Sequence, residues 1–424
     1  MSETVTISRL GARGDGIAED GTPVAGALPG ERVAIRREGG RGVLEAVEAA
    51  SPDRIEPFCP YYGRCGGCAT QHIAPEPYAA WKRGLLAQAL SQAGLPVEPG
   101  ALIDAHGDGR RRITLHVRER DGRAEAGLMA ARSHDLVAID HCPITVPGLH
   151  RAPAVAEALA APLGHGRKPL DIAATATVTG LDIDIRGHGP VSEGVRGVLT
   201  RLAGELDLAR LSIHGDVVVE RRPPEIGEGP ARRVPPPGSF LQATQAGEAT
   251  LTALVLEAMD EGKAKVRRVG DLFCGSGPFA LALAAGGREV HAAEGEAAAI
   301  TALTRAYRAG AGYARITAEA RDLFRRPLLG PELDALDAVV FDPPRAGAEA
   351  QARRIAESKV PLVVGVACDP GTFARDAATL IAGGYRLERV TPVDQFAWSA
   401  HVELVGVFRK AARKPAGKTL RRPR

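Results

Sequence analysis

The sequence predicts an α/β protein in which a small β-barrel and a mixed α+β region precede a doubly wound parallel sheet. From about residue 238 onwards, apolar strand-like runs alternate with helical ones, which is typical of a parallel sheet covered by helices on both faces. The first part of the chain contains only short apolar runs separated by turn residues, which is typical of an all-β unit. We therefore expect domains at 1–56, 57–237 and 238–410, followed by a basic, disordered tail at 411–424.

The composition is that of a globular protein without a membrane-spanning segment. Hydrophobic residues make up 45% of the 424 residues and charged residues 25%, which is ordinary for a soluble fold. No run approaches about eighteen uncharged apolar residues, the length that suggests a membrane span, and the N-terminus lacks the apolar core of a secretory signal. We expect a cytoplasmic protein with no membrane contact, and nothing implies an obligate protein partner.

The net charge of +3 comes from the end of the chain. Residues 409–424 carry eight basic side chains and no acidic one. Such a tail either contacts phosphates without sequence preference or keeps the chain in solution.

The first domain is expected to be an OB-like barrel of about five strands. Residues 1–56 contain runs such as VTISRL and GVLEAVEA, with turn residues between them. Barrels of this type commonly bind single-stranded nucleic acid. Aromatic residues are absent from these runs, which weakens a base-stacking role, so a β-appendage without a ligand remains the alternative.

The middle domain opens with a cluster of cysteines, CPYYGRCGGC. Cys59, Cys65 and Cys68 are spaced Cys-x(5)-Cys-x(2)-Cys, and clustered cysteines in a reducing compartment bind metals more often than they form disulfides. Cys142 is the candidate for a fourth thiolate, because a proline follows it, as is common beside cluster ligands. Four thiolates suit zinc as well as an iron–sulfur cluster, so the residues alone leave both open.

A strand-like stretch further along the middle domain begins with three arginines, Arg110, Arg111 and Arg112. This run predicts either a solvated edge strand or a strand that faces nucleic acid. The prolines at 223–224 and 235–237 indicate the linker to the third domain.

The third domain carries a glycine turn at the end of a strand, in RRVGDLFCGSGPFALALA. The strand contains Asp271, and Gly275 and Gly277 follow it before a helix begins. Glycines at such a turn let the backbone approach a ligand, and the helix N-terminus favours polar or anionic groups. Glu294 ends the next strand, where a carboxylate can accept both ribose hydroxyls. Together these residues predict the S-adenosylmethionine site of a class I methyltransferase.

Two further strands bring reactive side chains to the same edge of the sheet. The run AVVFDPPRAGA places Asp342 there and offers Arg345 as a fixed cation. The next strand, in PLVVGVACDPG, places Cys368 just beyond its apolar run. A small buried hydrophobe is the alternative for a free cysteine, but the carboxyl edge of an open α/β sheet is where ligands bind, which favours a nucleophile.

Nearly the whole chain resembles the RNA uracil-5 methyltransferases, which make 5-methyluridine in tRNA or in large-subunit rRNA. The resemblance is carried by the cysteine spacing, by GALPGERV, by SFLQATQAGEATL and by the closing run DQFAWSAHVELVGVF. It implies that residues 1–56 form an RNA-binding TRAM domain and that the partner is structured RNA. It also implies that the four cysteines, Cys59, Cys65, Cys68 and Cys142, hold a 4Fe-4S cluster rather than zinc.

The resemblance also implies a covalent mechanism. Carbon 5 of uracil is a poor nucleophile, and a thiolate that adds to carbon 6 turns the ring into an enolate that can attack a methyl group. Cys368 matches this nucleophile, and Glu403 matches the base that removes the proton from carbon 5. Because a free cysteine has a pKa near ~8.5, we expect Arg345 or another cation to lower the pKa of Cys368. The cofactor-contacting positions that match, beside Gly275 and Gly277, are Gln242, Phe273, Glu294, Asp322 and Asp342.

Several positions depart from the family pattern. They lie around the nucleophile, after the glycine turn and in the closing run, at Gly365, Ala367, Asp369, Pro278, Ala397 and Ser399. The nucleophile and the base are unchanged, so these departures bear on target choice and on the polar contacts of Cys368.

Three alternatives remain beside a 23S rRNA methyltransferase, which the barrel and the four cysteines favour. A tRNA uracil-5 methyltransferase is the first. An RNA-binding assembly factor with a vestigial transferase fold is the second, and the intact Cys368 and Glu403 argue against it. Cytosine methylation is the third, but enzymes of that kind usually carry a second cysteine where this chain has DPPRAG.

Overall fold

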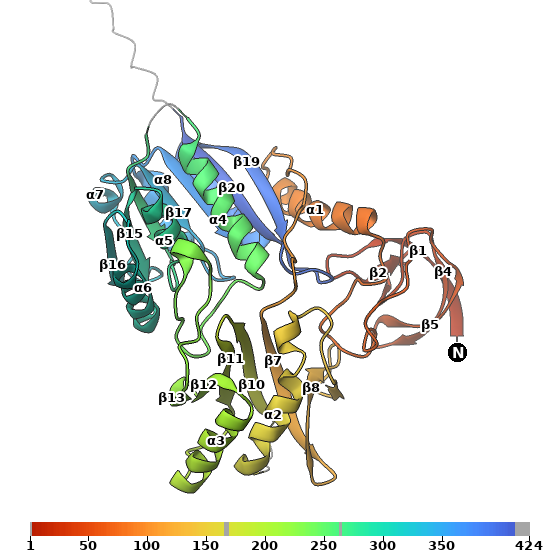
Figure 1. Cartoon of the computed structure of the whole chain (residues 1–424). Helices are drawn as coiled ribbons and strands as arrows, with labels where there is room; N and C mark the ends of the chain where they lie inside the picture. Colours follow the sequence, from red (N-terminus) through yellow and green to blue (C-terminus); the bar gives the residue numbers. More distant parts are fainter. Residues whose placement is uncertain (1, 165–168, 263–264, 412–424) are drawn as a thin grey trace, which may run out of the picture.

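The computed structural model describes residues 2–164, 169–262 and 265–411, and these residues form three β-sheets (Figure 1). One sheet is a closed five-stranded barrel, the second has seven strands and the third has eight. The basic tail lies outside the described residues from position 412 onwards. Among the helices of the described ranges, none is long and apolar enough to cross a membrane.

The barrel contains the first five strands in the order β1-β2-β3-β5-β4. Their bounds are β1 Ser2–Leu10, β2 Gly16–Ala18, β3 Pro23–Val24, β4 Arg32–Glu38 and β5 Arg41–Ala49. Because side chains alternate between the two faces of a strand, branched residues such as Ile7, Val33 and Ile35 fill the interior. The residues that precede the cysteine cluster thus form a barrel, and its assignment as a TRAM domain stays a prediction.

The seven-stranded sheet has the order β13-β12-β11-β10-β7-β8-β9. Its strands are β7 Arg112–Arg120, β8 Arg123–Met129, β9 Leu136–Ala138, β10 Leu170–Thr177, β11 Gly180–Arg186, β12 Leu208–Ile213 and β13 Asp216–Glu220. Helices α2 (Ala152–Ala160) and α3 (Glu193–Glu205) pack on it. Of the two alternatives for the strand behind the three arginines, the solvated edge strand is wrong, because β7 lies between β10 and β8; a strand that faces nucleic acid stays a prediction.

The eight-stranded sheet has the order β16-β15-β14-β17-β18-β20-β19-β6. Its later strands are β14 Arg268–Leu272, β15 Glu289–Glu294, β16 Ile316–Ala320, β17 Ala338–Phe341, β18 Leu362–Ala367, β19 Tyr385–Asp394 and β20 Glu403–Lys410. The helices are α4 Gln245–Asp260, α5 Pro278–Ala285, α6 Ala297–Ala309, α7 Gly330–Leu333, α8 Glu349–Glu357 and α9 Pro370–Ala382. Strands β14 to β18 run parallel, and β20 pairs antiparallel with both β18 and β19.

Two hydrophobic clusters cover the opposite faces of this sheet, so the prediction of a doubly wound α/β domain is confirmed. The strand order reverses between β14 and β17, since β15 and β16 lie on the other side of β14. In open α/β sheets the ligand binds outside the carboxyl ends of the strands at such a reversal. The fold therefore points to the ends of β14 and β17 as the place to look for a site.

Helix α1 (Pro75–Gln92) packs against the domain of the third sheet, and strand β6 (Ile103–Asp104) is the last strand of that sheet. Strand β6 pairs with β19, and Leu86 and Leu90 of α1 lie in the core beneath α9. Both elements fall in the range 57–237 that we expected to form the middle domain, so that boundary does not match the packing. An apolar helix face shows that a helix is covered, but not by which sheet.

Candidate active site

Five of the side chains predicted from the sequence meet at the carboxyl edge of the third sheet. Asp271 lies near the end of β14, Glu294 ends β15, and Asp342 and Cys368 directly follow β17 and β18. The Asp342 N–H donates to the carbonyl oxygen of Leu272 at 3.2 Å, which brings Phe273 beside Asp342. Parallel strands that end together thus bring residues from 271 to 368 to one place.

The turn after β14 has an unusual backbone conformation at three positions. Phe273, Gly275 and Gly277 all have positive φ, at 60°, 53° and 83°, a region that L side chains rarely adopt. A Cβ at Gly277 would lie 2.3 Å from Leu303 Cδ1, whereas a Cβ at Gly275 would meet no atom of the described chain within 4 Å. The Gly275 N–H donates to Glu294 Oε2 at 3.1 Å. The turn is therefore tied to the end of β15 and leaves open space beside Gly275.

Three carboxyl groups, those of Asp271, Asp342 and Glu294, lie close together at this edge. Asp271 is fully buried, and neither of its oxygens has a hydrogen-bond partner within the described residues. Burial, and then the charges of Asp342 and Glu294, raise the pKa of Asp271 to about 8. A cationic ligand would favour the ionised form of these buried carboxyl groups. S-adenosylmethionine carries a sulfonium and an ammonium group, so the side chains present fit this cofactor.

Asp322 lies beside Glu294, but its side chain is engaged locally. The Arg321 N–H donates to the Glu294 carbonyl oxygen at 2.7 Å, and Asp322 Oδ1 accepts from the N–H groups of Phe324 and Arg325 at 3.0 and 3.3 Å. The ring of Phe324 lies 5.4 Å from that of Phe273 and is 48% exposed. Phe324 was not predicted from the sequence, although it follows Asp322 by two positions.

Cys368 and Glu403 face each other across two antiparallel strands. Ala367 of β18 pairs with Leu404 of β20, so the next positions along the ladder are Cys368 and Glu403. The cysteine is partly exposed and the glutamate is 2% exposed. Strands β18 and β20 are not consecutive in the sequence, so it is their pairing in the sheet that brings the candidate nucleophile and the candidate base together.

The expected lowering of the Cys368 pKa is not what the structure shows. Burial raises the pKa of this thiol to about 11, and the charges of Glu403 and Asp342 act in the same direction. Arg345 acts in the opposite direction but does not outweigh them. The expectation was wrong in its net sign because it counted the cation and left out the cost of burying a thiolate.

A chain of amides connects the two buried carboxylates of the site. Gln242 Nε2 donates to Asp342 Oδ2 at 3.0 Å, and Gln395 Nε2 donates to Gln242 Oε1 at 2.6 Å and to Glu403 Oε2 at 2.8 Å. Burial raises the pKa of both Asp342 and Glu403, and the charge of Asp342 raises that of Glu403 further. Gln242 was expected here, whereas Gln395 was missed, because its role depends on contacts that no motif records.

Helix α1 fastens the loop that leads to Glu403. The fully buried Lys82 pairs with Asp394 and donates to the carbonyl oxygens of Phe396 and His401 at 3.0 and 2.7 Å. The hydroxyl of Tyr78 donates to Asp394 Oδ2 at 2.6 Å and accepts from the Trp398 N–H at 2.9 Å. These contacts hold both ends of the loop against one helix.

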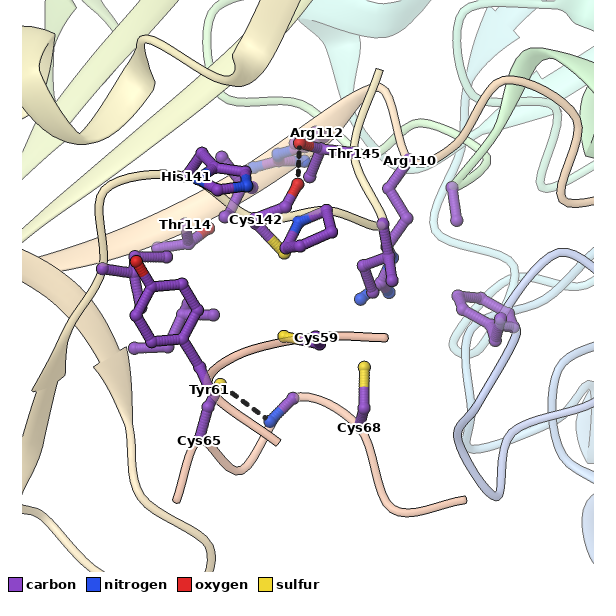
Figure 2. A pocket seen from close by; sticks show the side chains of 18 of the residues that line it. Cys59, Tyr61, Cys65, Cys68, Arg110, Arg112, Thr114, His141, Cys142 and Thr145 are labelled. Atoms are coloured by element: carbon purple, nitrogen blue, oxygen red, sulfur yellow. Dashed lines mark hydrogen bonds between the residues drawn. The ribbon is translucent and has the colours of Figure 1, made fainter. Parts of the chain in front are cut away.

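The four cysteines of the second predicted site line one cavity of about 390 Å³. Figure 2 shows Cys142 across the cavity from the loop that carries Cys59, Cys65 and Cys68, with Arg110 beside them. Burial, together with the neighbouring thiols, raises the pKa of Cys68 to about 12 and that of Cys142 to about 11.

Within the described ranges, no three His, Cys, Asp or Glu side chains come together closely enough to hold one metal ion. The iron–sulfur site therefore stays a prediction.

The sequence comparisons all match this chain to RNA methyltransferases. Residues 234–412 match the sequence profile of the family described as tRNA (Uracil-5-)-methyltransferase. A Brucella suis biovar 1 protein described as an uncharacterized RNA methyltransferase is 46% identical over 409 residues, which cover 96% of this chain and 97% of that protein. The 23S rRNA (uracil(1939)-C(5))-methyltransferase of Pseudomonas savastanoi pv. phaseolicola is 35% identical and covers 96% of this chain and 93% of its own length.

A solved structure shares the fold over almost the whole chain. The crystal structure of Pyrococcus abyssi tRNA (uracil-54, C5)-methyltransferase in complex with S-adenosyl-L-homocysteine superposes with a TM-score of 0.72. It covers 96% of this chain and 100% of that one at 22% identity.

Proposed function

The chain belongs to the S-adenosylmethionine-dependent RNA uracil-5 methyltransferases, and from this membership we propose that it makes 5-methyluridine in 23S rRNA with Cys368 as nucleophile and Glu403 as base. The observation that supports the assignment most directly is the pairing of β18 with β20. That pairing sets the thiol and the carboxyl group at facing positions at the carboxyl edge of β18. A binding protein without catalytic activity would have no need for this arrangement.

S-adenosylmethionine, when bound, supplies the methyl group that carbon 5 of the uracil receives. The residues proposed to hold it lie around the turn after β14 and at the neighbouring strand ends: Gln242, Phe273, Gly275, Gly277, Glu294, Asp322 and Asp342. The open space beside Gly275 and the unpartnered oxygens of Asp271 support this placement.

The proposed chemistry begins at the sulfur of Cys368. The thiol loses its proton to solvent, and the thiolate adds to carbon 6, which places the electron pair of the C5–C6 double bond on carbon 5. Carbon 5 then takes the methyl group from the sulfonium, which leaves as the neutral thioether. Glu403 then takes the proton from carbon 5, the double bond re-forms, and the C6–S bond breaks to return the thiolate. In the free protein the thiol is protonated, because its pKa is raised to about 11. A cationic ligand beside Asp342 would offset the negative charges that raise the pKa of Cys368.

Ribosomal RNA is the proposed substrate, and tRNA is the alternative. The chain is 35% identical to a 23S rRNA methyltransferase over 96% of its length and only 22% identical to the tRNA methyltransferase of similar fold. We propose that the barrel of β1–β5 binds the RNA as a TRAM domain. Such an enzyme would act in the cytoplasm, where the ribosomal RNA is made and folded.

We also propose that the four cysteines hold a 4Fe-4S cluster. They lie around one cavity, and their neighbour Arg110 is largely buried against them. A buried cation beside four thiolates would offset the negative charge of a cluster. No step of the methyl transfer needs the cluster, so its proposed role is to hold the segment between the barrel and α1.

A covalent trap tests the central proposal. In 5-fluorouridine RNA the base carries fluorine where Glu403 would remove a proton, so the enzyme cannot complete the turnover. We expect the full-length protein with S-adenosylmethionine to form a stable protein–RNA adduct at Cys368, and the C368S variant to form none. If the wild-type protein methylates RNA but never forms the adduct, the covalent mechanism is wrong. If it binds RNA without either result, the assembly-factor alternative holds.

A further inference from the structure

We propose that Gln395 is a positioning residue that leaves only Oε1 of Glu403 to take the proton from carbon 5. This inference deepens the proposed function and rests on it. It comes from the direction of four hydrogen bonds, which a single backbone amide determines.

The backbone N–H of Ala243 sets the orientation of the Gln395 side chain. It donates to Gln395 Oε1 at 2.8 Å, and since a backbone N–H can only donate, the group facing it must be the oxygen. The Nε2 group therefore points the other way, where its two hydrogens are directed at Gln242 Oε1 and Glu403 Oε2. Both hydrogens are used, so no donor of Gln395 is left over.

The same reasoning fixes Gln242. Its Oε1 accepts from Gln395, so its Nε2 faces Asp342 and donates to Oδ2. Each of the two carboxyl groups thus receives an N–H on one particular oxygen. A carboxyl oxygen that accepts an N–H in this way is the poorer place for a proton.

Glu403 is left with one oxygen for chemistry. Oε2 accepts from Gln395 whether Glu403 is ionised or protonated, so the proton taken from the substrate resides on Oε1. An amide neither gains nor loses protons in this pH range, so Gln395 cannot pass that proton on to Asp342. Gln395 is fully buried, and water does not replace its N–H without a change in packing.

A glycine of α4 keeps Gln395 in this position. A Cβ at Gly247 would lie 2.6 Å from Gln395 Oε1 and 2.7 Å from its Cβ. Real Cβ atoms do not approach so closely, which means that α4 packs on the glutamine only because residue 247 has no side chain. The glutamine is therefore held between the helix and the two carboxyl groups.

The test uses the full-length protein, S-adenosylmethionine and an RNA transcript that the wild-type protein methylates. In Q395L we expect the methylated protein–RNA adduct to form at close to the wild-type rate and to break down about ten- to a hundredfold more slowly. This is less than the roughly hundred- to ten-thousandfold that a general base contributes, because Glu403 itself remains. The N–H of Gln395 lowers the pKa of Glu403, against the effects of burial and Asp342. The pH midpoint of adduct breakdown should therefore move upward in Q395L, with Asp342 and Cys368 as the other titratable groups that face Glu403.

Two variants separate positioning from folding. Q351L removes another fully buried glutamine, which bonds only to the backbone of Leu328 among the described contacts; it should lower stability without slowing adduct breakdown. G247A displaces Gln395 without changing its chemistry, so it should slow breakdown as Q395L does, even if Q395L folds poorly. Equal slowing of adduct formation and breakdown, or an unchanged pH midpoint in both Q395L and G247A, would overturn the inference. Failure of the wild-type protein to form any adduct would instead overturn the proposed function.

Discussion

Lys82 and Asp394 form a buried ion pair that joins helix α1 to the end of strand β19. The lysine is 0% exposed and the aspartate 3%, and 312 residues separate them in the chain. Their contacts with Phe396, His401 and Tyr78 hold the loop that leads to Glu403. The position of the proposed base therefore depends on a helix from the first quarter of the chain.

Removal of Lys82 should destabilise the protein strongly. K82M leaves the buried charge of Asp394 without its partner, and breaking a buried pair in this way costs about 3–5 kcal/mol. Urea unfolding of the purified variant should show the loss. K359M is the matched control, because Lys359 and Asp334 form an exposed pair that should contribute little. Equal effects of the two substitutions would contradict the role given to the buried pair.

The stability contributed by Glu248 should depend on pH in acid. Burial tends to raise the pKa of this carboxyl group, but Arg233 and Arg111 outweigh it and lower the pKa to about 2 from an ordinary 4.5. A lowered folded-state pKa means that the contribution is fully present above about pH 4.5 and is lost as the pH falls towards 2. The difference in unfolding free energy between wild type and E248Q should shrink across that window, and a constant difference would disagree with the ion pairs.

Arg233 should affect binding of the cofactor. Its guanidinium is buried and donates to Ser276 Oγ in the glycine turn at 2.9 Å as well as to both oxygens of Glu248. R233M frees the turn, so the KM for S-adenosylmethionine should rise several-fold. R232M changes the exposed neighbour, which pairs with Glu225 at the surface, and should leave that KM unchanged. A similar KM in both variants would show that Arg233 does not support the glycine turn through Ser276.

Charges around Cys368 should shift its reactivity in opposite directions. Asp342 raises the pKa of the thiol and Arg345 lowers it. D342N should therefore speed alkylation of Cys368 below pH about 11, and R345Q should slow it, as followed by mass spectrometry of the peptide that contains Cys368. Shifts of the same sign in both variants would be inconsistent with this electrostatic account.

Loss of one cavity thiol should remove the proposed cluster. Anaerobically purified wild-type protein should contain about four iron atoms per chain with matching sulfide, and C68S should contain far less. C368S alters a cysteine that lies outside the cavity, so its iron content should match that of the wild type. Zinc in place of iron in the wild-type protein would revive the alternative that the residues alone left open.

Local patterns in the sequence were enough to predict the doubly wound sheet. Asp342 and Cys368 each follow an apolar run directly, and parallel strands end at a common edge, so their meeting needed no further information. The glycine turn was equally readable, because the positive φ at Gly275 and Gly277 favours glycine. Cys142 was predicted from the sequence to join the cluster of Cys59, Cys65 and Cys68, and the four line one cavity, whereas the choice of an iron–sulfur cluster over zinc came only from the family resemblance.

Contacts between segments far apart in the chain decided the rest. The helix α1 looked like part of the middle domain because its apolar face does not specify the surface that covers it. The sign of the Cys368 pKa shift depended on burial, which a motif does not record. Gln395 joined the site only through the Ala243 N–H and the missing side chain at Gly247, which come from α4 and the segment before it. Sequence by itself determined which residues end each strand, since that depends on neighbours along the chain, and tertiary packing alone decided which of their atoms meet, since hydrogen-bond direction and burial depend on neighbours in space.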